Sequence, residues 1–275
     1  MNPFHRPLRI EIAYENAINK LLSVWMHLPT FEVWNDVITL LQAYSQSIQF
    51  LQKYASELAT KMVTSVSIQN ANSWREAARQ STKGRLIYQM LRQELMQPKM
   101  RDRLHFLIQS NAQYISTIPQ EVATRTVHYV QQEQMAGRRS EDILKDLRPH
   151  MQNLKKWQVE RIARTEVAKA DTAVTRTRAE YIGLNWYVWE TSHDARVRRS
   201  HEHMNGVLVS WNDPPSPESM VHEKPVGHYH AGNIYNCRCI ALPVVDTSEV
   251  KWPHKVYANG RIATLSLTHF KRIAA

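Results

Sequence analysis

The chain has 275 residues, is 43% hydrophobic and carries a formal net charge of +10. This length suits one large domain or two modest ones, with enough apolar residues to bury a core. The sequence has no run of about 18 apolar residues, and the start Met1–Arg6 lacks the apolar stretch of a signal peptide. We therefore expect no membrane association, and we expect the protein in the cytoplasm where it is made.

The positive charge is spread over the whole sequence and is not concentrated in a basic tail. A basic protein is attracted to nucleic acid or to acidic surfaces. The charge therefore favours contact with double-stranded DNA without sequence specificity, through the phosphate backbone. The alternative is a basic surface with no role in nucleic-acid binding.

The first half of the chain is predicted to be helical. Glycine is scarce there, since only Gly84 precedes Gly137. Apolar residues recur at helical spacing over residues 10–62, and the same texture resumes over 74–95 and 100–115. Stripes of this kind are typical of cores and helix–helix contacts, so we assign no chemistry to them.

Prolines and capping residues predict where helices begin and end. Pro29 followed by Thr30, a good N-cap, predicts a break between two helices. Further helices are expected over 119–136, over 140–149 with an end near its proline, and over 154–181.

The texture changes after Gly183, where glycine and proline become frequent. Strands are predicted at Trp186–Trp189 and at Ile240–Val245, which are rich in aromatic or β-branched residues. The predicted class is therefore α+β and predominantly α-helical, with long N-terminal helices followed by a small, loop-rich α+β C-terminal module. We divide the chain into a helical region (1–118), a central domain (119–245) and a C-terminal extension (246–275).

Eight of the 13 histidines and both cysteines follow residue 183. Zinc prefers four ligands from thiolates and imidazoles. Cys237 and Cys239 offer two sulfurs, His201 and His203 offer two imidazoles, and residues i and i+2 of an extended segment point to the same side. These four residues are predicted to bind one zinc ion. The alternative is a pair of buried thiols with unrelated surface histidines.

A metal-dependent nuclease is a rival hypothesis, in which Asp194, His201 and Glu202 would supply acid, base and ligand. No paired-carboxylate or His-Asn-His signature accompanies them, so we expect no catalytic residues and no enzyme. Arg238 lies between the cysteines, and a structural role is favoured in which it binds Asp194 or a C-terminal carbonyl by bidentate hydrogen bonds.

Three ordered blocks resemble the phage Mu F-like head-morphogenesis family, which includes minor head proteins of tailed bacteriophages. The first is I-A-R-T-E at 162–166, the second is D-x-R-V-R-x-x-H at 194–201, and the third is N-C-R-C at 236–239. The likeness covers about residues 120–245, and it does not require His203. Its motif positions with an expected structural role are Asp194, Arg198, Gly206, Asn236 and Arg238.

The resemblance implies a structural virion component that acts in procapsid assembly at the portal vertex. Its expected partners are the phage portal protein, the major capsid or scaffolding protein, and double-stranded DNA. The expected location is the interior of the head near the portal, and the host cytoplasm during assembly. A nuclease or a toxin-like effector carried in the head is the alternative function.

Overall fold

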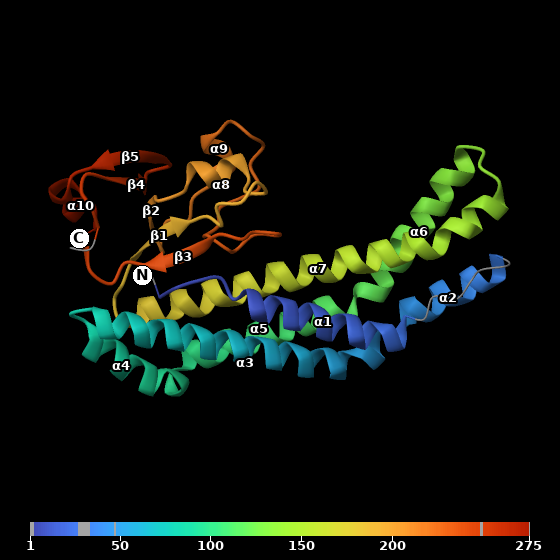
Figure 1. Cartoon of the computed structure of the whole chain (residues 1–275), viewed down its shortest axis with the longest axis horizontal. Helices are drawn as coiled ribbons and strands as arrows, with labels where there is room; N and C mark the ends of the chain where they lie inside the picture. The colour runs from blue at the N-terminus through green and yellow to red at the C-terminus, as the bar shows by residue number, and fades with distance from the viewer. Residues whose placement is uncertain (1–2, 27–33, 47, 248–249, 275) are drawn as a thin grey trace. The chain divides into compact units, whose positions relative to one another are not determined.

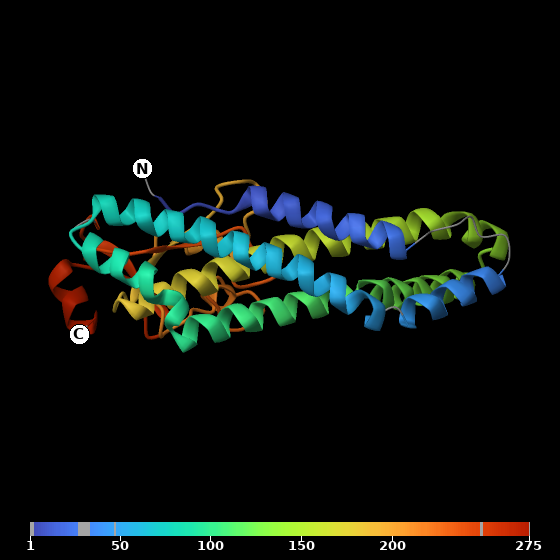
Figure 2. The same ribbon diagram turned by 90° about the horizontal axis from the view of Figure 1, so that it is seen from below.

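Helices make up most of the chain in the computed structural model, which describes residues 3–26, 34–46, 48–247 and 250–274 (Figures 1 and 2). A small five-stranded sheet follows in the C-terminal part. The predicted class, α+β and predominantly α-helical, is confirmed. Among the described residues, we find no helix with the length and apolarity that a bilayer crossing requires.

The helical part begins with α1 (Leu8–Trp25), α2 (Trp34–Gln46), α3 (Ile48–Gln80), α4 (Gly84–Gln93), the short 3₁₀ helix η1 (Glu94–Met96), α5 (Pro98–Ser116) and α6 (Ile118–Met135). The predicted proline start of α6 is confirmed, because Pro119 lies in its first turn, where its missing N–H has no helical partner to lose. The predicted break at Pro29 and Thr30 lies outside the described residues.

One prediction in this part is wrong. The sequence indicated two helices, over 140–149 and 154–181, but α7 (Ser140–Tyr181) is continuous with Pro149 inside it. Pro149 is exposed, whereas Ile143, Leu147 and Met151 form a buried stripe at a spacing of four residues. Burial of this stripe offsets the free-energy cost of a proline inside a helix, which is about 3 kcal/mol or more because a backbone hydrogen bond is lost.

The chain forms two compact units built from discontinuous segments. One comprises Met1–Leu8, Thr64–His105 and Arg164–Ala275, and the other comprises Arg9–Val63 and Phe106–Ala163. Within the second unit, α2 packs on α6. The linear division expected at residues 118 and 245 stays a prediction.

The sheet of the first unit has the order β3-β1-β2-β4-β5. Its strands are β1 (Trp186–Glu190), β2 (Leu208–Ser210), β3 (Ile240–Pro243), β4 (His254–Ala258) and β5 (Arg261–Leu265). All pairs are antiparallel except β2 with β4. Three short helices accompany it, α8 (Arg199–His203), α9 (Pro217–Met220) and α10 (Leu267–Ala274). The two predicted strands correspond to β1 and β3.

Strand β1 packs with both of its faces. Tyr187 and Trp189 are fully buried in a core that also contains both cysteines. The alternate residues Trp186 and Val188 pack against a second cluster around Phe270 of α10. Because side chains alternate along a strand, one strand serves two cores, and the cysteines lie in the first of them.

A buried polar network crosses the helices of the first unit. The Arg178 guanidinium is fully buried and donates to both carboxylate oxygens of Glu94, at 2.6 and 2.8 Å. It also donates to the Asn70 side-chain oxygen at 2.7 Å, and the Asn70 amide nitrogen donates to Asp171 at 2.8 Å. The network joins α3, η1 and α7 through charged groups that have partners.

Asp171 should make the stability depend on pH. Burial raises the pKa of its carboxyl to about 6 from 3.8, although the hydrogen bond from Asn70 acts in the opposite direction. The folded state therefore holds this proton more tightly than the unfolded state, so stability falls as pH rises from about 4 to 6 and stays lower above it.

Asp171→Asn is accordingly expected to raise the free energy of unfolding at pH 7.5 by about 1–2 kcal/mol, with little effect at pH 4. Thermal unfolding at the two pH values measures this difference. Asp102→Asn, at an exposed position, controls for the loss of a negative charge. An Asp171→Asn protein that melts no higher than the parent at pH 7.5 would contradict the expectation.

Candidate metal centre and arginine pocket

The turn that carries the cysteines is anchored to α7. Asn236 has φ 54°, a left-handed conformation that asparagine tolerates. Its backbone N–H donates to Thr165 Oγ1 at 2.9 Å, and Arg164 Nη1 donates to its side-chain oxygen at 3.4 Å. The I-A-R-T-E and N-C-R-C blocks are therefore adjacent in space.

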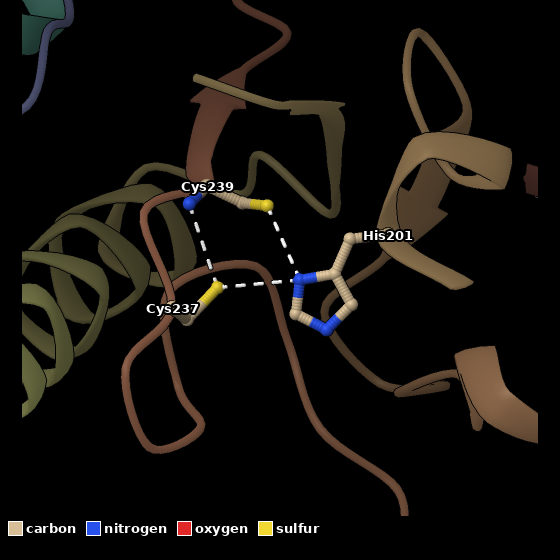
Figure 3. Close-up of side chains that lie close together, drawn as sticks. All are labelled: His201, Cys237 and Cys239. Carbon is tan, nitrogen blue, oxygen red and sulfur yellow. Dashed lines mark hydrogen bonds between the residues drawn. The ribbon is translucent and has the colours of Figure 1, made fainter. Parts of the chain in front are cut away.

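Three side chains converge in the core below this turn (Figure 3). His201 Nδ1 lies 3.4 Å from Cys239 Sγ and 3.6 Å from Cys237 Sγ. All three potential ligand atoms lie within 4.8 Å of one another, and all three residues are buried. A tetrahedral zinc ion with ordinary Zn–S and Zn–N bonds separates its sulfur and nitrogen ligands by about 3.6 Å. The spacing of the three residues fits such an ion.

The orientation of the His201 ring is set by two further buried residues. Its Nε2 lies 3.0 Å from the Tyr229 hydroxyl, which donates to Glu218 Oε1 at 2.5 Å. Because the Tyr229 proton is used on Glu218, the hydroxyl accepts the N–H of Nε2. The lone pair of Nδ1 then faces the two sulfurs, which is the tautomer a metal ligand needs.

The two thiols differ in acidity. The pKa of Cys237 lies well below its ordinary value, mainly because its sulfur accepts a hydrogen bond from the Cys239 thiol. The pKa of Cys239 is raised, first because it donates that hydrogen bond and second because it is buried. The pair holds one proton readily, and a bound cation would displace it.

His203 does not join this cluster, contrary to the prediction of a His201–His203 pair. The segment is helical and not extended, since both residues lie in α8. Two helical residues i and i+2 are about 200° apart around the axis, so His201 is buried while His203 is exposed. Nothing in the sequence pattern pointed to Tyr229 or Glu218, which support His201.

The remaining histidines of the stretch lie elsewhere. The His193 ring bonds to Glu190 Oε1 at 2.7 Å on the surface. His230 is buried against Arg176 and Tyr187, and burial lowers its pKa to about 4, so it is neutral at physiological pH. His222 and His228 are exposed.

The motif residues connect the loop after β1 to the segment before β3. The predicted contact between Arg238 and Asp194 is present at 2.7 Å, and the same Asp194 oxygen accepts the backbone N–H of Arg196 at 2.8 Å. That backbone hydrogen bond is the main cause that lowers the pKa of Asp194. Arg198 donates to the Tyr235 carbonyl at 2.9 Å and lies 4.6 Å from the centre of the Tyr235 ring. Gly206 has φ 74° in the turn before β2.

Gly232 brings the cysteine segment close to α7. It has φ +81°, and an added Cβ would lie 2.5 Å from Thr172 Oγ1 and 3.1 Å from the Cys239 carbonyl oxygen. Gly232→Ala is therefore expected to cost about 2–4 kcal/mol of unfolding free energy, from backbone strain plus overpacking. Gly137→Ala is the matched control, because φ is +78° there with nothing within 4 Å of the new Cβ.

The control should cost only about 1 kcal/mol, the contribution of left-handed strain alone. Thermal unfolding of the two variants measures the difference. Equal costs at the two positions would show that close packing at Gly232 is unimportant.

A pocket of about 210 Å³ opens beside the cluster. His201, Cys237 and Cys239 line it together with four arginines, Ser192, Val197 and Asn236; the arginines are Arg164, Arg196, Arg198 and Arg238. None of these lining residues is acidic. We call this feature the arginine pocket.

The nuclease arrangement considered from the sequence is not assembled among the described residues. Asp194 is held by Arg238, and Glu202 is exposed on α8. Both His201 nitrogens already face partners, namely the two sulfurs and Tyr229. The three ligand atoms could hold a cation, and positively charged side chains lie beside them.

Comparison with known proteins gives one family match and one relative. Residues 120–242 match the family described as phage Mu protein F like protein. The chain is also 30% identical over 155 residues to an uncharacterized protein of Haemophilus influenzae, a match that covers 55% of this chain and 32% of the relative. The chain thus spans about a third of that relative's length. No solved structure matches the chain significantly.

Proposed function

We propose that this chain is a bacteriophage minor head protein of the virion, because residues 120–242 match the family described as phage Mu protein F like protein. It acts as a structural component in procapsid assembly at the portal vertex. Its partners are the portal protein, with the major capsid or scaffolding protein as further contacts, and packaged double-stranded DNA bound without sequence specificity.

The single observation that carries this proposal is the family match, because its span contains all three motif blocks. Within that span the motif residues bond mainly to one another and to backbone groups, through pairs such as Arg238 with Asp194 and Arg198 with Tyr235. Such contacts stabilise a binding module rather than an active site. The net charge of +10 supports contact with DNA phosphates.

Partner binding is supported by large apolar side chains exposed on the helices. In the second unit Phe50 is 64% exposed, Phe106 59% and Met135 89%. Exposed aromatic and methionine side chains are enriched in protein interfaces.

We propose further that His201, Cys237 and Cys239 hold one zinc ion that stabilises the C-terminal module. The support is the sulfur–nitrogen spacing of 3.4 and 3.6 Å and the tautomer that Tyr229 and Glu218 impose on His201. Three protein ligands leave the fourth position of a tetrahedral ion to water or to another ligand.

Co-expression with the portal protein of the same phage tests the assembly role. The tagged full chain is expected to purify with the portal protein and to enter procapsids when capsid and scaffolding proteins are added. Phe106→Ser, at an exposed position, should weaken the association if the exposed side chains contact the portal. Failure to associate with the portal in procapsid assembly would overturn the role.

A metal-dependent nuclease or toxin-like effector is the second candidate, and its only support is the proposed metal beside the arginine pocket. Incubation of plasmid DNA with the zinc-loaded and magnesium-supplemented protein discriminates the two. The assembly proposal expects the plasmid to remain intact while its mobility falls through binding. Cleavage lost in His201→Ala would favour the enzyme.

A further inference from the structure

The arginine pocket carries an excess of positive charge. Arg196, Arg198 and Arg238 bring three guanidinium groups to its lining, and the carboxylate bonded to Arg238 is that of Asp194. A zinc ion with two thiolates would be neutral overall, so these groups leave a net charge of about +2. Crowded cations of this kind repel one another, and an anion in the pocket would remove the repulsion.

The guanidinium groups retain donors for such an anion. Arg238 is only 11% exposed, and its Nε is buried with no hydrogen-bond partner. Arg198 uses one Nη2 donor on the Tyr235 carbonyl. Arg196 is exposed at the rim, and its backbone, not its side chain, bonds to Asp194. An arginine has five N–H donors, so each of these three side chains keeps donors beyond the bonds that it makes.

The side chains that line the arginine pocket favour a phosphate group over a carboxylate. A carboxylate presents two oxygens in one plane, which one arginine fork can satisfy. A phosphate presents oxygens in a tetrahedral arrangement, which suits guanidinium groups arriving from α7, the loop after β1 and the segment before β3. The volume of about 210 Å³ also accommodates a phosphate with water.

We propose that the arginine pocket binds a phosphate group, and that one phosphate oxygen takes the fourth position on the metal held by His201, Cys237 and Cys239. This rests on the metal site proposed above. The phosphate comes either from free inorganic phosphate or from the backbone of DNA. The module would thereby combine its structural ion with a point of attachment for nucleic acid.

Cobalt(II) in place of zinc gives a direct readout, because its visible absorption reports the ligands of the ion. The full chain is loaded with cobalt and titrated with sodium phosphate at constant ionic strength, with chloride as the reference. A saturable change in the cobalt bands is expected with phosphate alone. Binding of phosphate detected by calorimetry without any change in the bands would overturn the coordination to the metal.

Arg196→Gln and Arg199→Gln form a matched pair, since both residues are exposed and only three positions apart, and only Arg196 lines the pocket. The Arg196 variant should bind phosphate about tenfold more weakly, and the Arg199 variant should stay within twofold of the parent. Equal losses of affinity in the two variants would show that only the overall charge matters, and would overturn phosphate binding in the arginine pocket. Tighter binding of a glutamate-rich peptide than of phosphate would also overturn it.

Two further experiments identify the origin of the phosphate and test the metal and the pocket separately. A DNA duplex of arbitrary sequence without terminal phosphates is added to protein that has bound inorganic phosphate. Displacement of the inorganic phosphate identifies the DNA backbone as the source, and no displacement identifies free phosphate. If the protein takes up no cobalt, the metal proposal alone is overturned. Calorimetry of the metal-free protein then tests the arginine pocket. Phosphate binding that depends on Arg196 supports the pocket, and the absence of such binding overturns it.

Discussion

Purified protein is expected to contain about one equivalent of zinc, and Cys239→Ser is expected to lose it together with much of the stability of the C-terminal module. His201, Cys237 and Cys239 lie in one core with their ligand atoms within 4.8 Å of one another. A buried site of this kind contributes its metal-binding free energy to folding. Chelation of the parent protein should therefore lower the melting temperature by more than about 5 °C.

The design separates loss of the ion from loss of a buried side chain. The chelator should shift the melting temperature of the parent but not that of Cys239→Ser, which has no ion left to remove. His203→Ala is the matched control, since its imidazole is two residues from His201 and exposed on α8. It should keep its zinc. Less than about half an equivalent of zinc in the parent, with no effect of chelation on its melting temperature, would overturn the proposed metal site.

Arg178→Met is expected to cost about 3–5 kcal/mol of unfolding free energy. Arg178 is fully buried and holds Glu94, which is 12% exposed, by two hydrogen bonds. Removing the guanidinium leaves that carboxylate and the Asn70 oxygen without their charged donor in a site with little water. In thermal unfolding this corresponds to a loss of about 10 °C or more.

The double variant Arg178→Met/Glu94→Gln should recover part of the loss, because the stranded charge is gone. Arg79→Met provides the exposed counterpart. Arg79 is 66% exposed and pairs with Glu76 on one helix turn, so its removal should change the melting temperature little. Similar costs for Arg178→Met and Arg79→Met would contradict the view that burial makes the difference.

Local patterns in the sequence predicted the elements they govern. Glycine scarcity and apolar periodicity gave the helices, and aromatic or β-branched runs gave β1 and β3. Two local rules failed because packing outweighed them. Pro149 does not end α7, since a buried stripe continues past it. His203 is not a ligand, because its short segment is helical and not extended.

Other features depend on residues that are distant in sequence, and no local pattern contains them. Arg178 lies 84 positions from Glu94 and 108 from Asn70. Tyr229 meets His201 across 28 positions. The pair β4 and β5 follows a parallel step from β2, which the sequence texture did not indicate. His201 with the two cysteines, and Arg238 with Asp194, were predicted together and lie together, because their residue types indicate their chemistry.

The two segments that supply the candidate ligands are 36 positions apart, from His201 to Cys237. An ion held between them would close a loop of that length, much as a disulfide does. A permanent cross-link that closes a loop of this size lowers the entropy of the unfolded chain and so raises its free energy by about 4 kcal/mol. A metal cross-link persists in a reducing compartment, where a disulfide would be lost. The stability of the module would then follow the supply of metal during its synthesis rather than the redox state of its surroundings.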